Sequence, residues 1–194
     1  MPDPINVLGI CGSLRRGSYN RMLLDAACEA APANMRIDAY HGLGDIPPYN
    51  EDVRVAGEPP VVSDLKRRIA DADALLIASP EYNYNVPGVL KNAIDWASRP
   101  PAESPLMNKP AAILGASTGN FGTARGQLAL RQVFVFTGTQ TMLKPELLVF
   151  QAHKRFDESG RLTDEMTRKL LAEFMAAFDG WARQFVPAKA GARV

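Results

Sequence analysis

The chain has 194 residues, of which 46% are hydrophobic, and a formal net charge of +1. These values suit one globular domain over residues 1–194. So small a net charge produces no overall electrostatic attraction for nucleic acid or for an anionic membrane surface. Two cysteines are too few for a disulfide framework and fit no metal spacing, so we expect Cys11 and Cys28 to be buried thiols. The N-terminus has neither a basic segment nor a long apolar run, so we expect a cytoplasmic protein with no membrane partner. From the small net charge and the residue spacing we also expect no nucleic-acid partner and no metal.

The first elements alternate between strand and helix patterns. Residues 5–11 form an apolar run that predicts a strand buried on both faces, and residues 20–31 carry apolar side chains at helical spacing until a proline stops them. Residues 35–40 alternate as a second strand. A loop with proline and glycine covers residues 47–60, and an amphipathic helix follows at residues 63–72. The order to this point is strand, helix, strand, loop, helix.

The same alternation continues through the middle of the chain. Residues 74–79 predict a third buried strand, and a helix with a proline at its start covers residues 87–98. Residues 110–117 predict a fourth strand, followed by a helix at residues 124–137 that a glycine ends. Residues 141–150 predict the fifth strand.

A final helix completes the predicted order of elements. Thr163 is its expected N-cap, with acidic residues in the first turn, and the helix runs to about Phe185. Residues 187–194 are expected to be a flexible tail.

Five strands alternating with helices predict an α/β fold with an open parallel sheet and helices on both faces. Right-handed crossovers leave few topologies, and we expect the doubly wound, flavodoxin-like strand order 2-1-3-4-5. In such sheets ligands bind outside the carboxyl ends of the strands, at the switch point. Three loops of unusual composition follow the first, third and fourth strands, so we expect the site there.

The first loop, residues 12–20, nearly matches a nucleotide-binding P-loop. Gly12 and Gly17 have the Walker spacing, but Ser18 and Tyr19 stand where that motif requires Lys and then Ser or Thr. Serine hydroxyls, an asparagine amide, two guanidinium groups and a helix N-terminus instead suit the terminal phosphate of a monoester. The plain alternative is a helix cap with two solvated arginines.

The other two loops suggest what carries that phosphate. Residues 79–88 place Tyr82, Asn83 and other polar groups where they can read the edge of a planar heterocycle. Residues 116–122 are small or glycine-rich, so their backbone can approach a ligand closely. A phosphate under one loop and a flat ring between the other two describe FMN, whereas an ordinary surface turn is the plain alternative.

Three segments, residues 12–20, 80–100 and 109–134, resemble the NADPH-dependent FMN reductase family, in particular its bacterial quinone, chromate and azo reductases. The resemblance extends from about residue 5 to 185. It implies a flavodoxin-like fold and non-covalent FMN. By position, the residues that it assigns to the cofactor are Ser13, Arg15, Ser18, Tyr19 and Asn20 around the phosphate, Pro80, Glu81, Tyr82 and Asn83 along the isoalloxazine edge, and Ser117 with Gly119 completing the pocket.

The resemblance also implies a mechanism and an assembly. NADPH or NADH would pass hydride to flavin N5, and a quinone, flavin, azo compound or metal oxyanion such as chromate would then take two electrons in ping-pong order. No side chain need act as acid or base, and Asn83 and Tyr82 are the candidates to tune N5. Relatives form homodimers or homotetramers, with Arg125 and Glu146 at positions of an inter-subunit polar network; a solvated or intrachain contact is the alternative for that pair.

Three other functions are open to such a sequence. A flavodoxin-like electron carrier would bind FMN without turnover, although carriers of that type are usually strongly acidic. An FMN-binding regulatory module would also lack turnover, and a P-loop hydrolase would need the missing lysine. The physiological acceptor, the choice between NADH and NADPH, the choice between dimer and tetramer and the role of residues 47–60 are not determined by the sequence.

Overall fold

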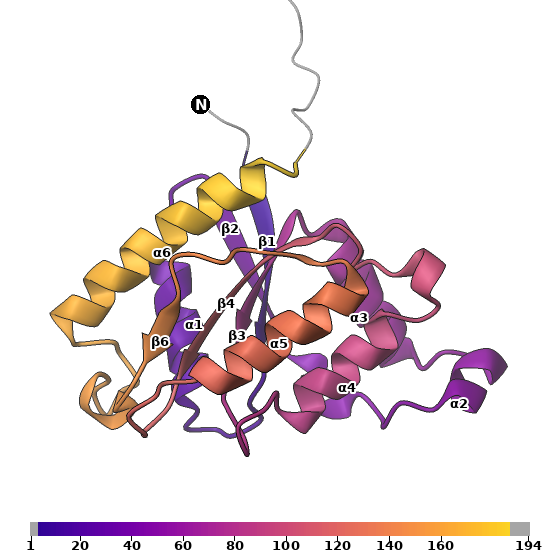
Figure 1. The fold of residues 1–194 in the computed structure, drawn as a ribbon, viewed down its shortest axis with the longest axis horizontal. Coiled ribbons are helices and arrows are strands. Elements are labelled where there is room, and N and C mark those ends of the chain that lie inside the picture. The colour runs from indigo at the N-terminus through magenta and orange to yellow at the C-terminus, as the bar shows by residue number, and fades with distance from the viewer. Residues whose placement is uncertain (1–3, 187–194) are drawn as a thin grey trace, which may run out of the picture.

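The computed structural model describes residues 4–186, which form a parallel sheet between two layers of helices (Figure 1). The strands are β1 (Ile5–Cys11), β2 (Met35–Tyr40), β3 (Ala74–Ala78), β4 (Pro110–Ala116), β5 (Gln140–Thr141) and β6 (Leu147–Val149). Their order is β2-β1-β3-β4-β5, and β6 also pairs with β4. All the pairs are parallel, which confirms the flavodoxin-like order.

Each face of the sheet has its own apolar core. The helices are α1 (Tyr19–Glu29), α2 (Glu51–Ala56), α3 (Pro60–Asp71), α4 (Gly88–Ala97), α5 (Ala124–Thr137) and α6 (Glu165–Arg183). Helices α1 and α6 cover one face of the sheet, and α3, α4 and α5 cover the other (Figure 1). Their apolar side chains form one core on each face. Every residue of β3 and β4 is buried, because both faces of these strands are covered.

The expected fifth strand is two short strands. Both β5 and β6 pair with β4, while residues 143–146 between them are exposed and stand outside the ladder. Pro145 explains the interruption, because proline has no N–H to donate to a neighbouring strand. The prediction of one continuous strand at residues 141–150 was therefore wrong.

The loop at residues 47–60 contains the unpredicted helix α2. The side chain of Asn50 accepts from the Asp52 N–H at 2.9 Å, and Arg54 pairs with Glu51 at 2.6 Å. No residue of α2 is buried, and the helix projects away from the two layers in Figure 1. Helix α3 begins at Pro60, earlier than predicted, because proline suits the first turn of a helix.

The N-cap of α6 is Asp164 and not Thr163. Its Oδ2 accepts from the N–H of Thr167 at 2.9 Å and from its hydroxyl at 2.6 Å. These bonds, together with the nearby Arg155, lower the pKa of Asp164 to about 2. Thr163 instead donates its hydroxyl to the carbonyl of Arg155 at 3.2 Å. The expected flexible tail at residues 187–194 lies outside the described residues.

The two cysteines differ in their surroundings. Cys11 is 2% exposed, and burial raises the pKa of its thiol, as a buried thiol should behave. Cys28 on α1 is only half-buried, so the expectation of burial was wrong for it. Over residues 4–186, no helix has both the length and the apolar character needed to cross a membrane.

Candidate functional site

The loops after β1, β3 and β4 meet around one pocket of about 300 Å³. Its lining is Ser13, Arg15, Ser18, Tyr19, Asn20, Pro80, Glu81, Tyr82, Ala116, Ser117 and Thr118. Asn83 and Gly119, which the sequence placed in this site, lie next to the lining but not in it. Ala116 and Thr118 belong to the segment at residues 116–122 that the sequence assigned to the site, but they were not singled out as site residues.

Gly12 lets the first loop approach the second. A Cβ on Gly12 would lie 3.1 Å from Leu90 Cδ2 and 3.2 Å from Pro80 Cδ, closer than ordinary contact. Its N–H donates to the carbonyl of Ala78 at 2.9 Å, which continues the β1–β3 ladder into the site. Gly17 has open space where a Cβ would stand, so this position does not require glycine for steric reasons, as Gly12 does. The Walker-like spacing of the two glycines therefore has no common steric cause.

The N-terminus of α1 opens into the pocket. Ser18 is the N-cap, and its hydroxyl accepts from the Arg21 N–H at 3.3 Å. The first-turn N–H groups of Tyr19 and Asn20 have no partner within the helix and carry the positive end of its dipole. Arg15 is exposed beside them, with its guanidinium carbon 5.7 Å from the centre of the Tyr19 ring. This set of donors fits a phosphate dianion.

The amide of Asn20 is used within the protein. Its Nδ2 donates to the carbonyl of Ala116 at 2.9 Å, and its Oδ1 accepts from the Ala116 N–H at 2.9 Å. The residue is 4% exposed. The side chain that the sequence assigned to the phosphate therefore fastens the start of α1 to the end of β4. Only its backbone N–H is placed for a ligand.

Residues 82–85 form a small hairpin at the pocket. Tyr82 and Asn85 exchange two backbone hydrogen bonds of 3.1 and 3.0 Å. Asn83 and Tyr84 between them have φ of 52° and 62°, the positive values that tight two-residue hairpin turns require. Asparagine tolerates this conformation, but a tyrosine rarely adopts it. The Tyr82 hydroxyl lies 3.4 Å from Ser13 Oγ, which connects the hairpin to the first loop.

Glu81 points its carboxylate at the N-terminus of α5. Its Oε2 accepts from the Gly126 N–H at 2.9 Å, and its Oε1 lies 3.8 Å from Nη1 of Arg125. The nominal N-cap of α5, Thr123, makes no capping bond with its side chain. Glu81 therefore supplies the cap from 45 positions away along the chain. The sequence placed Glu81 in the site but gave no signal of this partner.

The third loop is held by the segment after β6. The N–H of Ser117 donates to the carbonyl of Val149, and the N–H of Ala152 donates to that of Ser117, both at 2.9 Å. Gln151 likewise donates its N–H to the Gly119 carbonyl at 2.9 Å. These bonds fix the loop beside the pocket, which Ala116, Ser117 and Thr118 line.

Arg125 and Glu146 each have partners in their own chain. The guanidinium carbon of Arg125 lies 4.0 Å from the ring centre of Tyr84 and 4.4 Å from that of Phe121. Glu146 pairs with Lys144 at 3.0 Å and lies 3.9 Å from Arg131. The structure gives no contact between Arg125 and Glu146, and their role between subunits stays a prediction.

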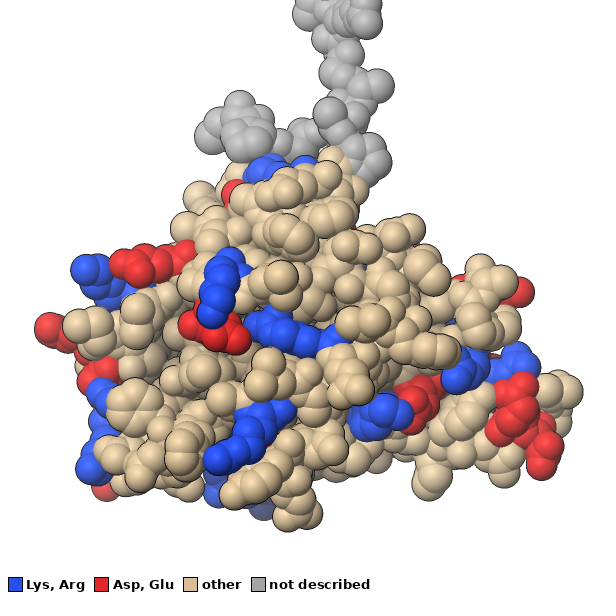
Figure 2. All heavy atoms as spheres, in the orientation of Figure 1, with Lys and Arg blue, Asp and Glu red and all other residues tan. Residues whose placement is uncertain are grey.

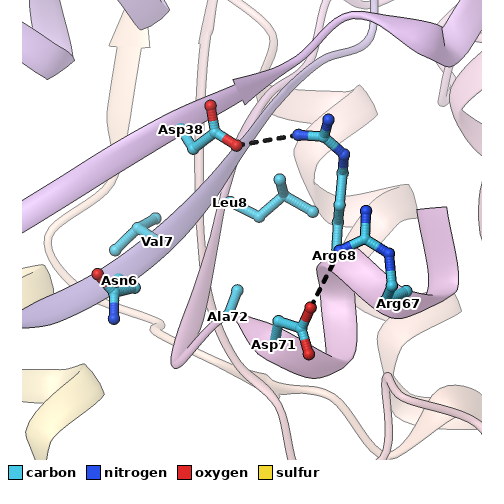
Figure 3. A pocket seen from close by; sticks show the side chains of 8 residues that line it. All are labelled: Asn6, Val7, Leu8, Asp38, Arg67, Arg68, Asp71 and Ala72. Carbon is cyan, nitrogen blue, oxygen red and sulfur yellow. Dashed lines mark hydrogen bonds and ion pairs between the residues drawn. The ribbon is translucent and has the colours of Figure 1, made fainter. Parts of the chain in front are cut away.

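A second hollow, of about 410 Å³, lies beside the amino-terminal half of β1 and the end of α3 (Figure 3). Arg68 pairs with Asp38 at 3.0 Å, and Arg67 pairs with Asp71 at 3.2 Å. These charges neutralise one another, so the hollow offers a ligand much less than the donors around α1 do. Nowhere between residues 4 and 186 do three or more His, Cys, Asp or Glu side chains gather in a way that could hold a metal ion.

Comparison with known families matches residues 5–154 to NADPH-dependent FMN reductase. The chain belongs to this family. An NAD(P)H-dependent FMN reductase of Pseudomonas aeruginosa is 52% identical over 184 residues, covering 95% of this chain and 98% of the relative. An NAD(P)H:quinone oxidoreductase of Solanum tuberosum is 46% identical, with 92% and 93% covered. The solved structure of FerB, a flavoenzyme NAD(P)H:(acceptor) oxidoreductase of Paracoccus denitrificans, has a TM-score of 0.86 at 38% identity, with 93% and 98% covered.

The residues of the pocket fit the cofactor that the NADPH-dependent FMN reductase family is named for. The α1 N-terminus, Ser18 and Arg15 offer donors to a phosphate, and no metal is needed to balance its charge. Pro80 and Tyr82 line the pocket with a pyrrolidine ring and an aromatic ring, which suit contact with a planar ligand. FMN carries both parts, a phosphate monoester and a planar heterocycle.

Proposed function

We propose that this chain is an FMN-dependent NAD(P)H oxidoreductase that reduces quinones and flavins. The observation that carries the proposal is the meeting of three loops in one pocket, with an open helix N-terminus at one side and the hairpin at the other. Its membership of the NADPH-dependent FMN reductase family and its relatives' names support the same activity. FMN, when bound, would supply the chemistry by accepting hydride at N5 and passing two electrons on.

The chain's own residues bind and orient. Ser13, Ser18, Arg15 and the N–H groups of Tyr19 and Asn20 would hold the phosphate, and Pro80 to Asn83 would border the ring. Ser117 and the loop up to Gly119 would close the opposite side. No side chain is needed as acid or base, and the backbone near Asn83 would tune the N5 edge through hydrogen bonds.

Donor and acceptor would use the same opening in turn, which is ping-pong order. Tyr82 at the pocket is 49% exposed, so the ring edge would remain accessible to flat molecules of varied shape. We extend the acceptor range on this basis to azo compounds and to metal oxyanions such as chromate. A reduced nicotinamide donor and free thiols suit a cytoplasmic location.

The test is an anaerobic visible spectrum of the FMN-loaded protein before and after NADPH and, separately, NADH. We expect the oxidised flavin spectrum to bleach and to return when benzoquinone is added. Bound flavin that neither nucleotide reduces would identify an electron carrier or a binding module instead. Absence of bound flavin would refute the assignment of all three loops.

The phosphate assignment has its own test. Arg15→Met should weaken FMN binding about tenfold, since a hydrogen bond to a charged group contributes roughly 1.5–3 kcal/mol when sheltered and less when exposed. Arg36→Met on β2 removes an exposed arginine far from the pocket and should leave FMN affinity unchanged. Equal affinities for the two variants would remove Arg15 from the phosphate site.

We also propose that the protein is a homodimer or homotetramer. The outer face of α5 carries Leu128, Val135 and Phe136, which are 62%, 82% and 70% exposed. Figure 2 shows this face as mostly tan, with a Lys or Arg group near its middle and further charged groups beside it. An apolar helix face of this kind favours burial against a second copy. Arg125 in the first turn of α5 and Glu146, which lies 3.9 Å from Arg131 of the same helix, are our candidates for polar contacts across it.

A further inference from the structure

Four residues, of which only Glu81 also lines the pocket, hold the hairpin at residues 82–85. We call Glu81, Tyr84, Phe121 and Arg125 the clamp. Arg125 lies with its guanidinium between the rings of Tyr84 and Phe121, at 4.0 and 4.4 Å, and its Nη1 is 3.8 Å from Glu81 Oε1. The clamp thereby connects the second loop, the third loop and the first turn of α5.

The hairpin needs such support because it has little of its own. Asn83 and Tyr84 both have positive φ, a conformation in which tyrosine is strained. Two backbone hydrogen bonds close the turn. The ring of Tyr84 is 67% exposed, so apolar burial cannot hold it in place. The contact that fixes this ring is the guanidinium of Arg125 stacked on it.

Glu81 also helps to hold Arg125 in place. Its side chain is 10% exposed and caps α5 through the Gly126 N–H, so its position is fixed. A Cβ on Gly126 would lie 3.2 Å from Glu81 Cβ and 3.3 Å from the carbonyl of Asn85, so glycine is what allows the hairpin to reach α5. A carboxylate held this way keeps Arg125 oriented toward the hairpin rather than toward solvent.

We propose that Arg125 is a positioning residue within one subunit, which fixes the hairpin through Tyr84 and Glu81 and so sets how the flavin edge is held. The proposal rests on the proposed function, because it assigns the hairpin to the border of the flavin ring. Every contact that it uses lies within one chain, so it stands beside the contact between subunits proposed for Arg125 and does not depend on it.

The experiment compares Arg125→Met, which removes the charge, with Arg125→Lys, which keeps it. The control is Arg68→Met on α3, because Arg68 also pairs with carboxylates and lies 5.9 Å from a tyrosine ring centre, but at the hollow in Figure 3. Three quantities are measured: FMN affinity by flavin fluorescence, the midpoint potential of the bound flavin, and amide hydrogen exchange of Tyr82 and Asn85 in the apoprotein.

Arg125→Met should weaken FMN binding about tenfold, shift the midpoint potential and speed exchange at Tyr82 and Asn85 about fivefold, the scale expected for losing a cation stacked on two rings. Arg125→Lys should keep affinity and exchange within about threefold of the wild type, because an ammonium also stacks on aromatic faces. Arg68→Met should match the wild type in all three measurements. In the double variant with Glu81→Gln, the loss of affinity should be smaller than the product of the two single losses, since the residues act on one hairpin.

Unchanged affinity and exchange in Arg125→Met would overturn the proposal. A loss of FMN affinity in Arg125→Met that occurs only at dilutions where this variant dissociates would overturn it too, because Arg125 would then affect the flavin only through contact between subunits. Faster amide exchange throughout the sheet in Arg125→Met would also overturn the proposal, because Arg125 would then stabilise the whole fold and not the hairpin in particular. Amide exchange is measured without flavin, so it tests the clamp alone. Failure of the proposed function would appear instead as bound flavin in the wild type that NAD(P)H does not reduce.

Discussion

Asn20 connects two loops of the site with a single amide. The donor and the acceptor of its side chain both pair with the backbone of Ala116 in a buried place. A buried backbone group that loses its only partner has a high desolvation penalty, whereas the bond itself contributes less. Asn20 is thus a structural residue at the base of the phosphate loop.

Asn20→Ala should lower the free energy of unfolding by about 2–4 kcal/mol, because it leaves both the N–H and the C=O of Ala116 without a side-chain partner. Urea unfolding of the apoprotein measures this. The control is Asn120→Ala, whose side chain accepts from Gln151 at 2.9 Å on the surface and should change stability by less than about 0.5 kcal/mol. Similar losses in the two variants would contradict this role of Asn20.

Residue types in the three loops, together with their places after three neighbouring strands, were enough to predict that these loops meet around one pocket. The direction of each side chain was not predictable in the same way. Glu81 turns to Gly126 and Asn20 turns to Ala116, and both partners are far away along the chain. Such choices depend on packing that no local pattern records.

At the scale of elements, α6 begins where one aspartate satisfies its first turn. Asp164→Ala should lower the free energy of unfolding by about 1 kcal/mol at pH 7, the usual loss for an N-cap, and Thr163→Ala should lower it by less than half as much. The pKa of Asp164 is about 2 in the folded protein and is close to 3.9 in an unfolded chain. Since the folded value is depressed, its stabilising effect is complete above about pH 4 and is lost as the pH falls toward 2.

Urea unfolding between pH 7 and 2.5 checks this. The stability difference between the wild type and Asp164→Ala should shrink as the pH falls below about 4. A difference that stays constant to pH 2.5 would mean that the carboxylate charge has no part in the cap.

Glycines inside helices give a second prediction for elements. Gly180 in α6 is exposed, with no atom within 4 Å of the place where a Cβ would stand, so Gly180→Ala should stabilise the protein by about 0.5–1 kcal/mol. Gly126→Ala should bring no such gain, because the new methyl meets Glu81 and Asn85, and it should weaken FMN binding by displacing the hairpin. Equal stabilisation with unchanged FMN affinity would show that the hairpin tolerates a side chain there.

The buried strands were predictable as elements because a strand covered on both faces is a continuous apolar run. Helix α2 was not predictable, since six residues without a buried face leave no periodicity to detect. The break between β5 and β6 was marked only by Pro145, which a pattern of apolar residues does not reveal. The prediction thus succeeded where burial dictates the sequence and failed where the chain is exposed.

For the whole molecule, the apolar face of α5 predicts self-association. Val135→Glu should shift the protein toward monomer in sedimentation velocity, because a charge would have to be buried in the interface. Met166→Glu on α6 changes another exposed apolar residue, 63% exposed, and should leave the assembly intact. If Met166→Glu dissociates the protein and Val135→Glu does not, the interface lies on the other side of the sheet.

The bonds between Asn20 and Ala116, 96 positions apart, also bear on how the chain matures during synthesis. The first two loops are made within the first 90 residues, but the third is held by Val149 and Ala152. Until that segment is made, the edge of β4 that pairs with β6 has no neighbour, and contacts of such long separation form slowly. We therefore expect flavin to stabilise the chain only after residues 149–152 have been made. A ribosome stalled before residue 149 would present a protein with its phosphate loop formed and its third loop unanchored.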